Sequence, residues 1–182
     1  MSERRMSRII YRNAFCVVMA TFIAAAIPGC GKNSVAIPDP CALVTIDEIR
    51  RVAPDAASAN VAETPVEGGT IKTCVWKNGA GVDQIRLVSK AADNSSPVEA
   101  ALKAIMRNQL AVRVAAVPSV GPDAAAAFSG SGDGEIMTIL VAQNDKVFLD
   151  LRPQASGIRG EKSPGFAAIA ALMKTALDRS KK

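Results

Sequence analysis

The first 29 residues constrain the fold most, because their pattern predicts an export signal that is not part of the folded domain. A charge-free, mainly apolar stretch from Ala14 to Ile27 follows a cluster of arginines at Arg4, Arg5, Arg8 and Arg12. The stretch suits the apolar part of a secretory signal, which needs about 7–15 residues, and is short for a bilayer-spanning helix, which needs about 20. We therefore expect residues 1–29 to be an export signal, with an uncleaved membrane anchor as the less favoured alternative.

A cysteine stands directly after this segment. Ala26-Ile27-Pro28-Gly29-Cys30 resembles a bacterial lipobox, with an apolar residue at position −3 and a small one at −1, although Pro28 is unusual at −2. The resemblance implies that Cys30 carries the lipid, with acyl chains such as palmitate, and that residues 30–38 form a short tether. Ala24-Ala25-Ala26 is an alternative cleavage site, which would release a soluble protein that begins at Ile27.

The excess of positive charge lies largely in the signal. The chain has 22 Lys+Arg and 17 Asp+Glu, and residues 1–29 hold four of the arginines but a single glutamate. Aromatic residues make up 4% of the chain, so the stacking surfaces of single-stranded nucleic-acid binders are not expected. We predict no nucleic-acid partner. The absence of histidine excludes Ser-His-Asp and Cys-His catalysis and zinc sites that contain histidine.

Two cysteines, Cys41 and Cys74, remain for the folded domain, because Cys16 lies in the signal and Cys30 is expected to carry lipid. A disulfide is favoured in an exported chain, and this one would stabilise the fold by roughly 3–4 kcal/mol in the chain-entropy description. A metal site or a redox pair is less favoured, since there is no histidine and no C-x-x-C motif. We predict a structural disulfide and no cofactor.

Residues 39–182 predict a single α+β domain. Thr45-Ile46-Asp47-Glu48 is a capping box that begins a helix over about 45–53, and residues 54–69, rich in Ala, Pro and Gly, predict a loop. Apolar spacing predicts two more helices, one after Pro97 and one from Phe166 to Leu177. Strands are expected over 70–77, 82–90, 124–128, 135–143 and 147–152. The order α-β-β-α-β-β-β-α predicts an antiparallel sheet of four to five strands, with helices packed mainly on one face.

The start of this domain carries a family resemblance. Asp39-Pro40-Cys41-Ala42-Leu43-Val44-Thr45, a helix and then Cys74-Val75-Trp76 resemble an uncharacterised family of bacterial lipoproteins, best known from actinobacteria. Its members share D-P-C-x-L-x-T and C-x-W motifs. Residues 117–125 are similar to a later turn of the family, and the likeness covers most of residues 37–177, with departures at Pro122 and in the loop 54–69. The resemblance implies the fold, the disulfide and an envelope location. It implies no functional site, because the family has no established activity.

Residues that suggest chemistry are few. The sequence holds no nucleophile elbow, S-x-x-K motif, P-loop or H-E-x-x-H motif. Trp76, the single tryptophan, is a candidate contact for a ligand or partner. Core packing against a Cys41–Cys74 bridge is the favoured alternative, because alternation places Cys74 and Trp76 on the same sheet face. The acidic residues Asp123, Asp133 and Glu135 lack the spacing of a calcium loop and are expected to be solvated.

These observations favour a non-enzymatic binding or interaction module of the cell envelope. We expect a lipid anchor in the cell membrane or outer membrane, with the domain facing the periplasm or the cell exterior. The expected partner is an envelope protein, an envelope polymer or a small ligand. One alternative is a hydrolase that works through carboxylates alone, with Asp83, Asp133, Glu135 and Asp150 as its candidates. The other is a secreted, soluble inhibitor or ligand carrier.

Overall fold

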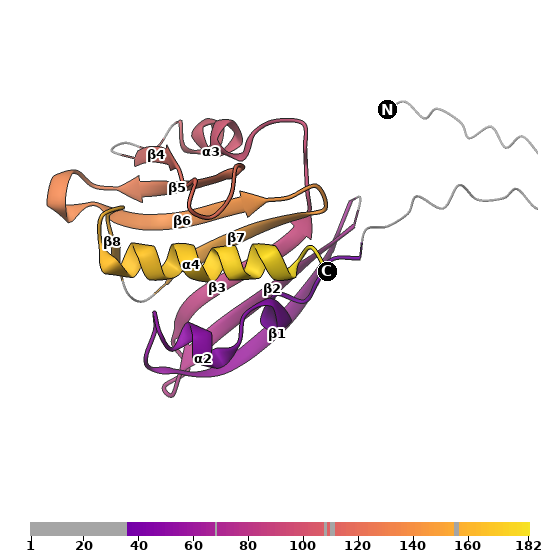
Figure 1. Cartoon of the computed structure of the whole chain (residues 1–182). Helices are drawn as coiled ribbons and strands as arrows, with labels where there is room; N and C mark the ends of the chain where they lie inside the picture. The colour runs from indigo at the N-terminus through magenta and orange to yellow at the C-terminus, as the bar shows by residue number, and fades with distance from the viewer. Residues whose placement is uncertain (1–35, 68, 108, 110–111, 155–156) are drawn as a thin grey trace, which may run out of the picture. The chain divides into compact units, whose positions relative to one another are not determined.

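The structure is a computed structural model, and it describes residues 36–182 except 68, 108, 110–111 and 155–156 (Figure 1). The expected signal, residues 1–29, and the expected lipid site, Cys30, lie outside the described residues. In the part of the chain that is described, no helix is both long and apolar enough to cross a membrane.

One antiparallel sheet of eight strands organises the described residues. Seven strands lie in the order β1-β2-β3-β7-β6-β5-β4, and β8 pairs with β6. The strands are β1 (Ala56–Val66), β2 (Gly69–Asn78), β3 (Asp83–Ala91), β4 (Val112–Ala116), β5 (Ala124–Ser129), β6 (Ile136–Gln143), β7 (Val147–Pro153) and β8 (Ile158–Arg159). Hairpins form two groups, β1-β2-β3 and β4-β5-β6-β7, which are joined where β7 pairs with β3. The pairing of β8 with β6 lies outside these hairpins.

The described helices are α1 (Pro40–Leu43), α2 (Ile46–Ile49), α3 (Val98–Met106) and α4 (Pro164–Arg179), with a 3-10 turn η1 at Gly132–Gly134. The predicted capping box begins α2. The Glu48 backbone N–H donates to Thr45 Oγ1 at 3.3 Å, and the Thr45 N–H donates to Glu48 Oε2 at 2.9 Å. Ser163 caps α4 by its side chain alone, with its Oγ accepting from the Phe166 N–H at 3.1 Å. These caps satisfy N–H groups that a helix leaves unpaired at its start.

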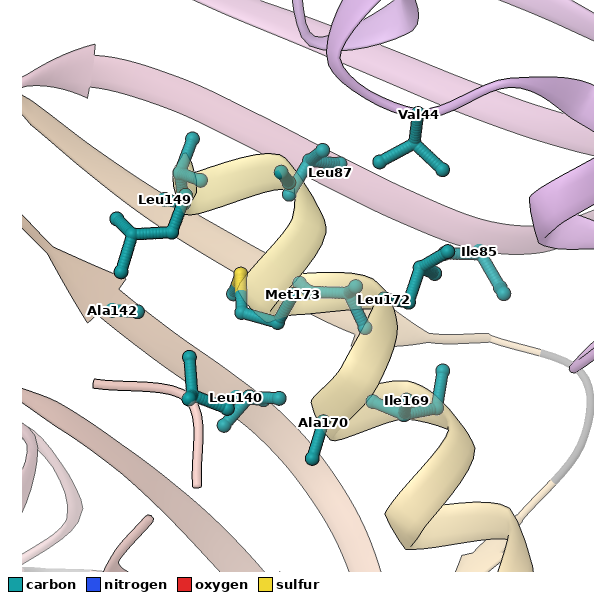
Figure 2. Close-up of a cluster of buried hydrophobic side chains, with 14 of the residues drawn as sticks. Val44, Ile85, Leu87, Leu140, Ala142, Leu149, Ile169, Ala170, Leu172 and Met173 are labelled. Atoms are coloured by element: carbon teal, nitrogen blue, oxygen red, sulfur yellow. The ribbon is translucent and has the colours of Figure 1, made fainter. Parts of the chain in front are cut away.

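The main core lies between one sheet face and α4, which crosses that face (Figure 1), and the short helices α1 and α2 add to it. Figure 2 shows side chains of α4 pointing into the inward-facing residues of the central strands. The residues labelled there are Val44, Ile85, Leu87, Leu140, Ala142, Leu149, Ile169, Ala170, Leu172 and Met173. Because side chains alternate along a strand, this face takes every second residue of β3 and β7, and of β6 from Leu140 to Ala142, where a register shift separates this pair from Met137.

The opposite sheet face has a smaller core of its own beneath α3. On β5, Ala124 and Ala126 belong to the main core, whereas Ala125 and Ala127 pack with Val98 of α3. The helix contacts β4, β5 and β6. Helices therefore cover one face broadly, as predicted, and α3 covers part of the other.

The mixed α+β class is confirmed, but the sheet has more strands than the four to five predicted. The segment 54–69 was expected to be a loop, and most of it is β1, which pairs with β2 from Ala56 opposite Asn78 to Val66 opposite Gly69. This strand lies at the sheet edge, and its side chains are exposed after Ala56. An exposed edge strand needs no alternation of apolar residues, so the pattern that reveals a strand is missing. The strands β4 and β8 were also not predicted.

The predicted disulfide is present. Cys41 and Cys74 are joined with their Cα atoms 5.2 Å apart, inside the usual range for such a bridge. The bond ties α1 to β2. Trp76 follows on the same face of β2, is 1% exposed and belongs to the main core. The ligand-contact interpretation of Trp76 is therefore corrected, because its side chain faces the helical layer and does not reach the surface.

Candidate ligand-binding cavity

A cavity of about 440 Å³ lies where α3 meets the uncovered part of the sheet. Its floor is formed by outward-facing residues of β3, β7 and β6, and α3 forms a wall. The floor is ordered by strand register. Val88 of β3 and Val141 of β6 lie opposite Asp150 of β7 on either side. The middle of the cavity floor therefore has an apolar side chain on each side of the Asp150 carboxylate.

Apolar side chains dominate the part of the cavity beneath the helix. Leu102 of α3 is buried against the floor, whereas Ile105, one turn on, is 69% exposed at the cavity edge. Phe148 of β7 closes the floor on the side of the β6–β7 turn, and Lys90 Nζ lies 4.5 Å above the centre of its ring. Ile105 therefore adds accessible apolar surface to the edge of a cavity that is already mainly apolar beneath the helix.

Asp123, in the turn before β5, holds α3 in place. Its Oδ1 atom accepts from the Val98 N–H at 2.7 Å, and its Oδ2 atom accepts from Gln143 Nε2 at 2.6 Å. The residue before the helix is Pro97, whose side chain makes no capping hydrogen bond. Asp123 therefore acts as the helix cap from a distant segment and joins α3 to β6. The expectation that this carboxylate is merely solvated is wrong, because both of its oxygens are bonded in a half-buried place.

Charged side chains border one end of the floor. Arg86 of β3 and Arg152 of β7 lie directly opposite each other, and both line the cavity. Arg152 makes a forked contact with Asp150, with Nη2–Oδ2 at 2.7 Å and Nε–Oδ1 at 3.0 Å. This contact raises the pKa of Arg152, since the hydrogen bonds from its guanidinium to the carboxylate favour its charged form.

Arg86 is in a different situation. Its Nε atom is buried and has no hydrogen-bond partner among the described residues. Its nearest carboxylate contact is an ion pair in which Nη2 lies 3.9 Å from Asp83 Oδ2, beyond hydrogen-bond distance. Asp83 lies closer to Lys77, at 3.5 Å. The Arg86 side chain is 42% exposed, and its Nε is the buried side-chain atom of the cavity that lacks a partner among the described residues.

The carboxylates proposed for a hydrolytic site lie in separate places. Asp150 lines the cavity and is paired with Arg152, whereas Asp83 stands at the start of β3 beside Lys77. Glu135 borders a different hollow and is paired with Arg113. The Arg113 Nε donates to Glu135 Oε1 and the Arg113 Nη2 donates to Glu135 Oε2, each at 2.8 Å. The hydrogen bonds from Arg113 lower the pKa of Glu135. The side chain of Asp133, the fourth candidate, lies outside what the structure describes.

No potential metal centre is found within the described ranges, where no group of three or more Cys, Asp or Glu side chains gathers. Sequence reasoning named Asp150 only as a hydrolytic candidate and missed Arg86 and Arg152, because each of the three is an ordinary outward-facing strand residue. Arg86, Asp150 and Arg152 alternate with buried leucines and isoleucines, as the solvent side of any strand would. They converge only because β7 pairs with β3, and that pairing could not be read from local sequence.

Comparison with known proteins adds no relative. Protein-family models, curated proteins and solved structures were each compared with the chain, and no match was found. The geometry and chemistry of the cavity therefore carry the functional proposal.

Proposed function

We propose that this protein is an exported, lipid-anchored, non-enzymatic binding module that takes a small, mainly apolar ligand into the cavity beside α3. The cavity carries the proposal. Its volume of about 440 Å³ is within the 300–1,000 Å³ typical of small-molecule sites, which are usually mainly apolar with a few polar groups. Leu102, Ile105 and Phe148 supply the apolar wall and floor, and Arg86 and Arg152 supply the polar groups.

Burial of exposed apolar surface provides the driving force for binding. Ile105 is 69% exposed, and covering such a side chain is favourable by about 25 cal/mol per Å² of apolar surface removed from water. Ile105 also lies on a helix that is held at its first turn by Asp123. The site is therefore largely formed before the ligand arrives, and little ordering cost opposes binding.

A binding role, in preference to hydrolysis, is supported by the state of the carboxylates. A general acid in a carboxylate pair requires a raised pKa, whereas Arg113 lowers the pKa of Glu135. Asp150, the candidate carboxylate that lines the cavity, accepts both of its short contacts from Arg152. Both groups are engaged as partners of arginine.

The envelope location is supported from two sides. The Cys41–Cys74 disulfide indicates an oxidising, exported environment. The anchor itself is proposed from the motif at Cys30. The folded domain begins near Pro38, whose carbonyl accepts from Ser89 Oγ at 2.7 Å. The proposed tether, residues 30–38, would reach at most about 30 Å, so the cavity would work close to a membrane surface.

Binding can be tested with N-phenyl-1-naphthylamine, an uncharged apolar dye whose fluorescence rises in an apolar site. We expect the folded protein to bind it at one site. Val88→Trp, on the half-buried floor, should fill the cavity and abolish the signal. Val61→Trp is the matched control, because Val61 is exposed on β1 and does not line the cavity. Absence of dye binding, or equal loss in both variants, would contradict the proposal.

The anchor is tested by the intact mass of the protein from its host membranes, with and without reductant. A mature chain that begins at Cys30 and carries acyl chains, and that gains two hydrogens on reduction, is expected. A chain that begins at Ile27 without lipid would contradict the anchor and favour a soluble carrier, while leaving the cavity proposal to the dye experiment.

A further inference from the structure

We infer that the ligand is an amphipathic anion: a headgroup with a carboxylate or phosphate binds Arg86 and Arg152, and its apolar chain lies beside α3. This inference rests on the proposed binding function and names the class of ligand. It follows from the placement of the two arginines, from the unpartnered Nε atom of Arg86 and from the apolar floor that begins next to them.

The cross-strand pair of arginines needs an anion. Arg86 and Arg152 occupy opposed positions on neighbouring antiparallel strands, where Cβ atoms are about 4.5–5.5 Å apart and like charges destabilise the sheet. Asp150 offsets one of the two positive charges through its contact with Arg152. The second charge, on Arg86, faces Asp83 at 3.9 Å, and Asp83 is shared with Lys77. A headgroup between the arginines would relieve the remaining repulsion.

The unsatisfied donor of Arg86 points to the same conclusion. A guanidinium carries five N–H donors, and a buried polar group without a partner destabilises a protein. The buried Nε of Arg86 lacks a partner among the described residues. The fork of an arginine matches a carboxylate or phosphate, which can accept two parallel hydrogen bonds. Such a headgroup would satisfy this group in the way that Asp150 satisfies Arg152.

The apolar floor starts two residues along β3 from Arg86. Val88 follows Arg86 on the same face of β3, and positions two apart on a strand are about 7 Å apart. From there the floor continues through Val141 and Phe148 toward the helix. The headgroup would therefore sit at the arginine end and the chain would run across the floor toward Ile105.

Arg113, which lies outside this cavity, differs from Arg86 in how fully the chain itself satisfies its guanidinium. Arg113 borders another hollow, but Glu135 and Glu161 already accept from its guanidinium, at 2.8 Å and 3.3 Å. Those hydrogen bonds raise the pKa of Arg113. Each nitrogen of the Arg113 guanidinium thus donates to a carboxylate of the chain, which is not the case for Nε of Arg86.

The test measures displacement of N-phenyl-1-naphthylamine by amphiphiles that share one chain and differ in headgroup, each below its micelle concentration. The dissociation constants of dodecanoate and dodecyl phosphate, measured by displacement of the dye, should be at least about tenfold lower than that of dodecanol. A factor of this size is what one charge-assisted hydrogen bond contributes to binding. Dodecyltrimethylammonium should bind no better than the alcohol. A tighter carboxylate or a tighter phosphate each supports the inference and distinguishes a fatty acid from a phosphorylated lipid as the source.

Arg86→Gln should remove the preference for the anions and leave the displacement by dodecanol unchanged. Arg86→Lys keeps the charge without the fork and should show an intermediate preference. Arg51→Gln, on an exposed residue beyond α2, is the matched control and should behave as the wild type. Arg86→Lys also serves if Arg86→Gln does not fold.

Three results would overturn the inference while the proposed function stands: equal affinity for dodecanol and dodecanoate, an anion preference that survives in Arg86→Gln, or binding to phosphatidylglycerol vesicles without displacement by the monomeric anions. If the protein does not bind the dye at all, the proposed function fails and this inference fails with it. The two failures are thus distinguishable.

Discussion

The two halves of the sheet differ in how many of their faces are covered. In the half formed by β4, β5 and β6, the residues Ala124–Phe128 of β5 are buried without interruption, because α4 lies on one side and α3 on the other. In the half formed by β1, β2 and β3, burial alternates along the second part of β2 and along β3, while β1 is exposed after Ala56, so the side chains of one face remain partly exposed. A strand covered once can carry charged residues on its free face, whereas a strand covered twice cannot.

The cavity lies where these two halves meet. Ile139 and Val141 of β6 lie on the part of this sheet face that α3 covers, and Arg86 and Arg152 lie on the uncovered part of the same face. A site that combines apolar floor and charged groups needs both kinds of surface within reach of one ligand. At the edge of α3, the apolar floor beneath the helix lies next to the charged residues of β3 and β7.

The largest change in the free energy of unfolding is expected from substitutions at two neighbouring residues of β6. Leu140 faces the main core and Ile139 faces α3 and the cavity. We expect Leu140→Ala to lower the free energy of unfolding by about 4 kcal/mol and Ile139→Ala by about 2 kcal/mol. The difference arises because the first truncation leaves a sealed void and the second only enlarges a space that solvent already reaches. Urea unfolding measures both, and equal losses would contradict a distinction between the two faces.

A smaller effect is expected at the attachment of α3. Asp123→Ala removes the acceptor for the Val98 N–H and for the Gln143 amide, and should lower the free energy of unfolding by about 1–2 kcal/mol. Asp123→Asn retains one acceptor and should lose less. Hydrogen exchange should show faster exchange in the first turn of α3 for Asp123→Ala, with α4 unchanged. Equal acceleration in both helices would show that the cap does not act on α3 alone.

The smallest effect concerns the other face, where α4 ends on α2. Arg179 donates to Glu48 from Nη1 and Nη2, each at 2.8 Å. These hydrogen bonds, opposed by burial and helped by Thr45, lower the pKa of Glu48 from 4.5 to about 2. A carboxyl with a lowered pKa stabilises the fold above its unfolded value, and this contribution is lost as the pH falls from about 4.5 to about 2.

Urea midpoints at pH 6 and pH 3 measure that loss. We expect the fall in stability to be smaller in Glu48→Gln than in the wild type, because the variant no longer has the carboxyl that must be protonated. Glu99→Gln, which removes a carboxylate from α3 outside this contact, is the matched control. Parallel pH profiles for Glu48→Gln and the wild type would contradict the assignment.

Local signals in the sequence were reliable where a short segment decides its own structure. The capping box at Thr45 and Glu48, the strands expected over 135–143 and 147–152, and the apolar stripe of α4 are each present as predicted. The count and placement of the cysteines predicted the Cys41–Cys74 bridge. These features depend on capping, on local apolar patterns or on elimination, none of which requires knowledge of the whole fold.

Features that depend on the sheet order were missed. The edge strand β1 shows no apolar alternation, and the role of Asp123 as a cap for α3 joins residues that lie 25 positions apart in the chain. The cavity requires β7 to lie beside β3, which brings Arg152 opposite Arg86. Such pairings are set by the packing of the whole domain, so no local pattern could have revealed them.

The way in which the chain enters the domain has a mechanical consequence. Pro38 is held by Ser89 of β3, and Cys41 is bonded covalently to Cys74 of β2. Tension that arrives from the N-terminal side is therefore passed to two inner strands before it reaches α2. With the disulfide intact, the force would act on β2 and β3 together. With the disulfide reduced, α1 and α2 would be pulled away from the sheet first.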